Sequence, residues 1–196
     1  MKPVVIFGGS FNPIHNGHLI IIQMISEMID FERFFIVPAK ISPFKKENSG
    51  IIPFVKRFEW VKSAAEGIDR IEVSDIEGET ICEVSYTIDT VRAFHKKFEN
   101  PLLLTVGGDS FESFEKWKDW KEILNKCTLL VYPRKKEYTF FEKKEIAEDK
   151  TIFLEAPIIE ISSSQIRNRI KKRLSIRGFV PQMLEAEIEE SYINLI

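Results

Sequence analysis

Short apolar segments alternate along the chain with longer segments whose apolar residues recur every three or four positions. Residues 4–7 are apolar on both faces and precede Gly8-Gly9, a pattern typical of a buried strand in a parallel sheet. Residues 102–106 repeat this pattern before Gly107-Gly108. The other predicted strands are 34–37, 71–73, 128–132 and 152–154. The predicted helices are 15–28, 57–65, 87–98, 111–124, 163–173 and 181–192.

Strands that alternate with helices indicate βαβ crossovers and one parallel sheet. The expected fold class is therefore α/β, a Rossmann-like doubly wound parallel sheet followed by C-terminal helices. A length of 196 residues fits a single domain, 1–196. Ligands of such sheets bind beyond the carboxyl ends of the strands, so the loops after the two glycine pairs are candidate binding sites.

Composition and charge narrow the classes of function. The chain has 28 basic and 30 acidic residues and a net charge of −2. A dedicated nucleic-acid-binding protein carries a basic excess, so we expect no nucleic-acid partner. Hydrophobic residues make up 44% of the chain and charged residues 30%, which is typical of a globular protein.

Cysteine usage and hydropathy point to one compartment. Cys82 and Cys127 are too few for a disulfide framework, and each stands in an apolar, strand-like segment, so we expect buried free thiols. The densest apolar run, 19–22, is much shorter than a membrane span. The first residues lack the pattern of a signal peptide. We therefore expect a cytoplasmic protein with no membrane partner.

The loop after the first predicted strand, residues 8–18, reads Gly-Gly-Ser-Phe-Asn-Pro-Ile-His-Asn-Gly-His. It matches neither the dinucleotide fingerprint nor the P-loop. If a helix begins near His15, then His15 and His18 share one face of its first turn. Two of the three histidines of the chain stand here, where amide groups and the helix dipole favour phosphate. We therefore favour a functional role over a packing role for this pair.

A second candidate element, residues 161–167, reads Ile-Ser-Ser-Ser-Gln-Ile-Arg. Ser162 with Gln165 fits a capping box, so the segment is consistent with a well-capped helix and no further role. A serine-rich helix start also offers hydroxyl and amide groups to an anion, with Arg167 one turn further on. The residues alone leave both interpretations open.

Together the two segments resemble the signature motifs of the HxGH nucleotidyltransferase superfamily, and within it the bacterial nicotinate-nucleotide adenylyltransferases. Three further segments share this resemblance, which covers nearly the whole chain in the same order. They are Ser85-Tyr86-Thr87-Ile88-Asp89-Thr90, Gly107-Gly108-Asp109-Ser110-Phe111 followed by Trp117 and Trp120, and Phe179-Val180-Pro181 with Tyr192-Ile193.

The chain departs from the family pattern at three places. Asn12 stands where the family usually has Asp. The usual Pro-Pro-His-Lys segment is Ser42-Pro43-Phe44-Lys45, and the usual Arg-Pro-Gly segment is Tyr132-Pro133-Arg134-Lys135. These changes bear on substrate preference more than on the type of reaction.

The resemblance implies that nicotinate mononucleotide attacks the α-phosphorus of ATP, giving nicotinate adenine dinucleotide and pyrophosphate. It implies catalytic roles for His15, His18 and Arg167. Mg²⁺ would be held by the ATP phosphates, with no metal site made by the protein. The implied ATP-binding residues are Gly8, Gly9, Ser10, Phe11, His15, His18, Gly107, Asp109, Ile161, Ser162, Ser163 and Arg167. The implied substrate-binding residues are Lys45, Thr87, Asp109, Trp117 and Arg134.

Several of these residues also have structural interpretations. Asp109 fits the N-cap of the following helix, and Trp117 and Trp120 fit a half-buried helix face. Segment 40–49 is the strongest candidate for a segment that orders around a ligand. Two alternative functions remain: an HxGH adenylyltransferase acting on nicotinamide mononucleotide or phosphopantetheine, and an inactive nucleotide-binding module. A homo-oligomer is left open.

Overall fold

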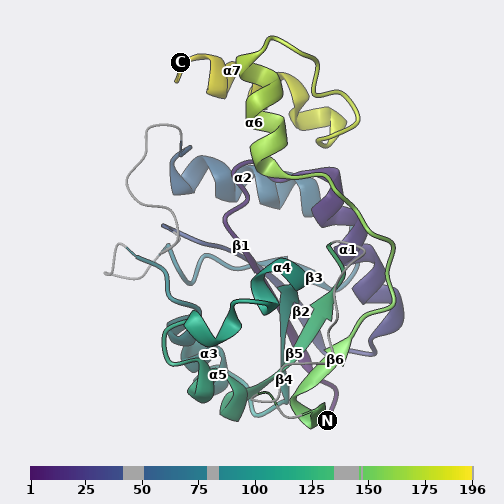
Figure 1. Cartoon of the computed structure of the whole chain (residues 1–196), viewed down its shortest axis with the longest axis vertical. Helices are drawn as coiled ribbons and strands as arrows, with labels where there is room; N and C mark the ends of the chain where they lie inside the picture. The colour runs from purple at the N-terminus through teal and green to yellow at the C-terminus, as the bar shows by residue number, and fades with distance from the viewer. Residues whose placement is uncertain (42–50, 79–83, 135–145, 147, 196) are drawn as a thin grey trace.

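A computed structural model describes residues 1–41, 51–78, 84–134, 146 and 148–195 of the chain (Figure 1). Six strands form one fully parallel sheet in the order β3-β2-β1-β4-β5-β6. The predicted α/β fold with a doubly wound parallel sheet is therefore confirmed. The strands are β1 (Val4–Gly9), β2 (Arg33–Pro38), β3 (Ile71–Val73), β4 (Leu102–Gly107), β5 (Cys127–Tyr132) and β6 (Thr151–Phe153).

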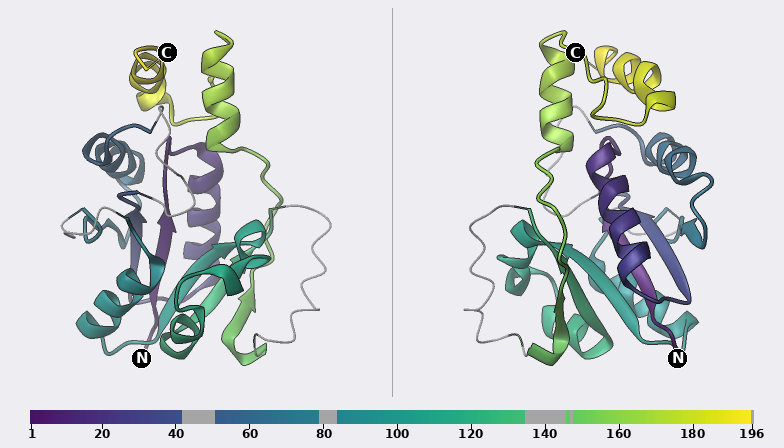
Figure 2. Two further views of the ribbon diagram at one scale, coloured as in Figure 1. Left: turned by 60° about the vertical axis from the view of Figure 1, so that its left-hand side comes forward. Right: turned by 90° about the vertical axis from the view of Figure 1, so that its right-hand side faces the viewer.

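Helices connect the strands and complete the C-terminal part of the chain. Figures 1 and 2 show α6 and α7 together at the end of the molecule opposite to the N-terminus. The α-helices are α1 (Asn16–Met28), α2 (Phe54–Ala65), α3 (Thr87–Lys97), α4 (Gly108–Phe111), α5 (Trp120–Lys126), α6 (Ser163–Lys171) and α7 (Glu185–Ile193). The short 3-10 helices are η1 (Phe114–Lys116), η3 (Glu148–Lys150) and η4 (Gln182–Leu184).

The sheet is covered on both faces by separate apolar clusters. Along β1, Val5 and Phe7 pack into one cluster with α1, α2, α6 and α7, whereas Val4 and Ile6 pack into the other with α3 and α5. Successive side chains of a strand point to opposite faces, so a continuous apolar run is what a strand buried on both faces requires.

The prediction of one continuous helix over residues 111–124 is wrong. The structure has α4, η1 and α5 there, and Asp119 at φ 52° interrupts the region just before α5. Asp is one of the few residues that enter the left-handed region, and a single such residue ends a helix. Trp117 therefore lies in an extended turn after η1 rather than on a helix face.

The C-terminal helices follow the prediction with shifted ends. Ser162 is the N-cap of α6, and its Oγ accepts a hydrogen bond from the Gln165 N–H at 3.2 Å. α6 ends at Lys171 rather than at 173. The helix predicted for 181–192 is split into η4 and α7, because only the residues from Glu185 onward take up regular α-helical geometry.

The predictions for the two cysteines and for segment 40–49 can be compared with the structure only in part. Cys127 is a buried free thiol, as predicted, and burial raises its pKa to about 12. Cys82 lies outside the described residues. Of segment 40–49, only Lys40 and Ile41 are described. No helix in the described ranges is long and apolar enough to cross a membrane.

Candidate active site

A crevice opens between β1 and β4, where the strand order of the sheet reverses. The two strands pair from Val4↔Leu102 to Ile6↔Leu104, but β1 continues to Gly9 and β4 to Gly107. Ligands of open parallel sheets bind at such a switch point. A cavity of about 250 Å³ lies there, lined by Ile6, Gly8, Gly9, Ser10, Ala39, Glu77, Ser85, Thr87, Thr90, Leu104, Thr105, Ser110 and Trp117.

The loop after β1 turns sharply under an aromatic ring. Phe11 is fully buried and takes φ 42°, in the left-handed region. A Cβ on Gly9 would lie 2.9 Å from the Phe11 ring, so only glycine fits below it. The Phe11 ring meets the His18 ring edge-on at 5.0 Å between centroids. Gly9 and Phe11 therefore help to orient one of the two predicted histidines.

The two histidines lie against one another at the start of α1. His15 is the N-cap residue, and its N–H donates to Nδ1 of His18 at 3.2 Å. Because Nδ1 of His18 accepts this bond, Nε2 is the ring nitrogen that can donate. The imidazole rings stack at 3.5 Å between centroids with 17° between their planes. The predicted pairing of the histidines on one helix turn is thus present.

Burial makes His15 a neutral group. The side chain is 1% exposed, and burial, followed by the positive charge of Arg134, lowers the pKa of His15 from 6.5 to about 3. A Cβ on Gly17 would lie 3.1 Å from both Nδ1 of His15 and Cγ2 of Ile159. Gly17 therefore leaves the room in which the His15 ring lies.

The second predicted motif contacts the first one directly. Ser163 Oγ donates to the carbonyl of Pro13 at 2.8 Å, and Arg167 Nη1 donates to the carbonyl of Asn12 at 2.7 Å. Arg167 Nη2 also donates to Ser164 Oγ at 3.0 Å. The two motifs are far apart in the chain, and the start of α6 holds the loop that leads into His15.

Arg134 follows β5 and lies on the same side as His15. Its Nη1 donates to the carbonyls of Ile159 and Ile161 at 3.4 and 3.5 Å, and its Nε lies 3.9 Å from Oδ2 of Asp109. Asp109 is not the N-cap of α4, since that residue is Gly107. Arg134 thus connects the predicted Asp109 loop with the segment that leads into α6.

Thr87 and Trp117 form another wall, on the β4 side of the crevice. Thr87 is the first residue of α3, and Trp117 packs on Phe114 at 5.1 Å between ring centroids. Both line the cavity that also contains Gly8, Gly9 and Ser10. The structure therefore brings these predicted residues together. Lys45 lies outside the described residues.

Sequence reasoning missed a buried arginine below the site. Arg57 is 1% exposed, and its guanidinium donates to four carbonyls at 2.6–2.8 Å. Burial lowers its pKa, and the planar fork with five N–H donors suits several acceptors at once. In the sequence Arg57 resembles any charged residue at the start of a helix, so no local signal marks it. The four carbonyls belong to Ser10, Ala39, Lys40 and Ile52.

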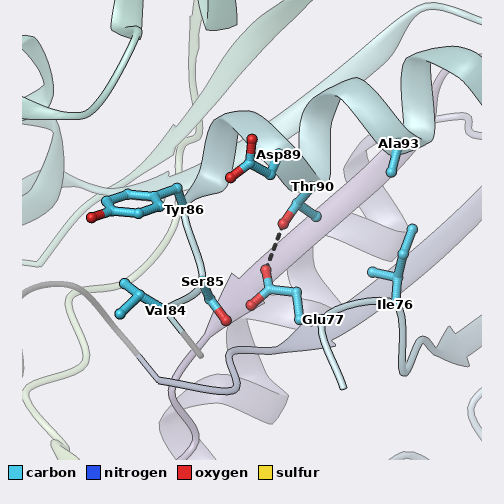
Figure 3. Close-up of a pocket in the computed structure, with 8 residues that line it drawn as sticks. All are labelled: Ile76, Glu77, Val84, Ser85, Tyr86, Asp89, Thr90 and Ala93. Atoms are coloured by element: carbon cyan, nitrogen blue, oxygen red, sulfur yellow. Dashed lines mark hydrogen bonds between the residues drawn. The ribbon is translucent and has the colours of Figure 1, made fainter. Parts of the chain in front are cut away.

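Glu77 was also missed. It lines both the main cavity and a neighbouring pocket, which Figure 3 shows. Thr90 Oγ1 donates to Glu77 Oε1 at 2.6 Å, and Ser85 Oγ accepts from the Lys40 N–H at 2.8 Å. Burial raises the pKa of Glu77. The loop after β2 is thus connected to the start of α3, near Thr87, through Glu77, Ser85 and Thr90.

Comparisons with known proteins agree with this geometry. Residues 6–169 match the family model described as cytidylyltransferase-like. A probable nicotinate-nucleotide adenylyltransferase of Thermosipho melanesiensis is 42% identical over 195 residues, covering 97% of this chain and 96% of that one. The protein of the same description from Thermotoga petrophila is 40% identical over 190 residues, 95% of each chain.

The fold has a solved counterpart of low sequence identity. The Plasmodium falciparum nicotinic acid mononucleotide adenylyltransferase complexed with NaAD superposes with a TM-score of 0.76 at 17% identity. The match covers 99% of this chain and 96% of that one.

The fold and the two joined motifs are those of a nucleotidyltransferase, and the chain belongs to the cytidylyltransferase-like family. Its most similar relatives in these comparisons carry the description nicotinate-nucleotide adenylyltransferase over almost their full lengths. The predicted family is confirmed.

Proposed function

We propose that the chain, as one domain over residues 1–196, transfers AMP from ATP to nicotinate mononucleotide in NAD biosynthesis. The observation that carries the proposal is the contact between the two motifs, in which Ser163 and Arg167 hold the carbonyls of Pro13 and Asn12 next to His15. The description shared by relatives that are 40% and 42% identical supports the choice of acceptor. A cytoplasmic location belongs to the proposal, since ATP is a cytoplasmic metabolite.

The reaction needs positioning more than proton transfer. A phosphate oxygen of nicotinate mononucleotide forms a bond to the α-phosphorus of ATP, and the bond from that phosphorus to the bridging oxygen of the β-phosphate breaks. Pyrophosphate leaves with the electron pair. The attacking phosphate is already an anion, so the protein has to align two polyanions and stabilise the charge that builds up.

The loop after β1 and the start of α6 form the ATP side of the proposal. His15 and His18 donate hydrogen bonds to the phosphates as negative charge develops. Arg167 adds a fixed positive charge, and the starts of α1 and α6 add helix dipoles. The other ATP-binding residues of the proposal are Gly8, Gly9, Ser10, Phe11, Gly107, Asp109, Ile161, Ser162 and Ser163.

The wall made by Thr87 and Trp117 forms the acceptor side. The half-buried indole of Trp117 offers a stacking face for the pyridine ring, and the Thr87 hydroxyl at the start of α3 is a donor for the ring carboxylate. Asp109 accepts hydrogen bonds from ribose hydroxyl groups. Lys45 and Arg134 supply positive charge to the acceptor phosphate.

Mg²⁺ enters the proposal with ATP as its counter-ion. Within the described residues, no group of three or more His, Cys, Asp or Glu side chains could hold a metal ion. In the proposal the ion is bound through the triphosphate, where it would neutralise charge.

The test is pyrophosphate release from ATP and Mg²⁺ with nicotinate mononucleotide, nicotinamide mononucleotide or phosphopantetheine in parallel reactions. The expected result is fastest turnover with the nicotinate form, with nicotinate adenine dinucleotide as the product. Chelation of Mg²⁺ should abolish turnover, and added Mg²⁺ should restore it. Turnover with phosphopantetheine alone would overturn the acceptor, and no turnover with any acceptor would favour the inactive binding module.

A further inference from the structure

The C-terminal segment, residues 178–192, contacts residues 8–18, the phosphate-binding loop of the proposed function, at two points. Figures 1 and 2 show the helices of this region at the end of the molecule opposite to the N-terminus. In the sequence this segment resembles the family's usual ending, but the proposed chemistry gives it no role. Its contacts with residues 12 and 16 of this loop indicate a role.

The first contact is made by Asn16, which lies between His15 and Gly17. The Asn16 N–H donates to the carbonyl of Phe179 at 2.8 Å. Its side-chain Nδ2 donates to the carbonyls of Gly178 at 2.9 Å and Val180 at 3.2 Å. One residue of the loop is therefore held by three consecutive carbonyls of the C-terminal segment.

The backbone of the segment is shaped for this contact. Gly178 takes φ 80°, a conformation that favours glycine. Val180 is buried in the same apolar cluster as Ile21 and Ile22 of α1. The carbonyls that bind Asn16 are thus fixed relative to the helix that carries His18.

The second contact is made by Tyr192 on α7. Its hydroxyl donates to Oδ1 of Asn12 at 2.6 Å in the protein interior, and the same oxygen accepts from the Ile52 N–H at 3.1 Å. Asn12 is 2% exposed. Burial raises the pKa of Tyr192, so the phenol stays protonated and remains a donor.

We propose that the C-terminal segment positions the phosphate-binding loop, with Asn16 and Tyr192 as positioning residues for the imidazoles of His15 and His18. The two contacts stand on either side of His15, at residues 12 and 16. Reactions that depend on alignment lose rate when a reacting group moves by a fraction of an ångström to one ångström. The kinetic part of this inference rests on the proposed function, whereas the contact itself does not.

The test uses Asn16→Ala, which removes the two side-chain bonds, and Tyr192→Phe, which removes one hydroxyl group and keeps the ring. We expect Asn16→Ala to lower kcat roughly tenfold and Tyr192→Phe roughly threefold, with KM values within about threefold of wild type. Asn16→Asp should lose at least as much as Asn16→Ala, because a carboxylate cannot donate to the two carbonyls.

A spectroscopic readout separates positioning from stability. The chain has three histidines, so the Cε1–H signals of His15, His18 and His95 can be followed in one NMR spectrum. His95 is in the last turn of α3 and serves as an internal reference. We expect the signals of His15 and His18 to shift in both variants, while the His95 signal stays in place.

The matched control is Asn100→Ala. Asn100 Nδ2 also donates to a distant carbonyl, that of Lys2 at 2.9 Å, but just before the start of β4. The Asn100→Ala variant should leave kcat and all three histidine signals unchanged.

The inference is overturned if Asn16→Ala and Tyr192→Phe keep the wild-type kcat per folded molecule. It is also overturned if they change only the thermal midpoint while the His15 and His18 signals match wild type. A wild-type chain without turnover would refute the proposed function, and the NMR comparison would still decide the role of the segment.

Discussion

His15 and His18 lie ring against ring, with their centroids 3.5 Å apart, and the backbone N–H of His15 donates to Nδ1 of His18. The first histidine is enclosed and neutral, whereas the second is half-buried. Each ring limits the positions open to the other. The stacked ring of His15 and the bond from its backbone N–H therefore preorganise the ring of His18, the more exposed of the two histidines.

Replacement of His18 with Ala should lower kcat at least about 100-fold, because a donor aimed at developing charge contributes mainly in the transition state. Steady-state pyrophosphate release measures this effect, and circular dichroism checks that the variant is folded. Unchanged turnover in the folded variant would remove His18 from the mechanism.

Replacement of Gly17 with Ala should lower the activity and leave the stability almost unchanged. The new Cβ would lie 3.1 Å from Nδ1 of His15, so the ring has to shift and kcat should fall roughly tenfold. Alanine favours a helix over glycine by about 1 kcal/mol, which offsets the crowding. Urea unfolding should therefore give a midpoint close to wild type. A wild-type kcat would contradict the tight fit around His15.

Stability should depend on pH through His15. Its pKa is about 3 in the folded chain and 6.5 in the unfolded chain, so only the unfolded state binds this proton between those values. The free energy of unfolding should fall as the pH drops below 6.5, by on the order of 2 kcal/mol by about pH 4.5. Denaturant unfolding of wild type and His15→Gln isolates the effect. If the free energy of unfolding has the same slope against pH in the two proteins, His15 is not the source of the pH dependence.

Replacement of Arg57 with Met should lower the free energy of unfolding by about 3 kcal/mol, because four buried carbonyls lose a charged donor. Arg57→Lys should lose less, since an ammonium keeps up to three donors. The control is Arg33→Met, which breaks a partly exposed pair with Glu72 and should cost about 1 kcal/mol or less. Equal losses in the Met variants would refute a special role for Arg57.

Replacement of Trp117 with Ala should weaken binding of nicotinate mononucleotide about tenfold if the indole stacks on the pyridine ring. Isothermal titration calorimetry measures the Kd directly. Trp120 also packs on Phe114 but does not line the cavity, so Trp120→Ala should keep the affinity within about twofold. Similar losses in both variants would indicate a packing effect rather than stacking.

The sequence alone determined the strand and helix alternation, the parallel sheet and the two motifs. These features depend on local information: apolar runs specify buried strands, glycine pairs mark strand ends, and Ser162 caps α6. The break at Asp119 could not be predicted, because the apolar spacing on its two sides also fits a continuous helix.

Only the tertiary structure decided how the distant pieces meet. Arg57 looks ordinary in the sequence, and Asn16 and Tyr192 stand there only as members of family segments without a role. Their importance comes from carbonyl and amide groups that the fold brings within hydrogen-bond distance. The neutrality of His15 likewise results from burial and from Arg134, far away along the chain. Hydrogen bonds and electrostatic effects act through space, so they are fixed only when the helices and strands have packed together.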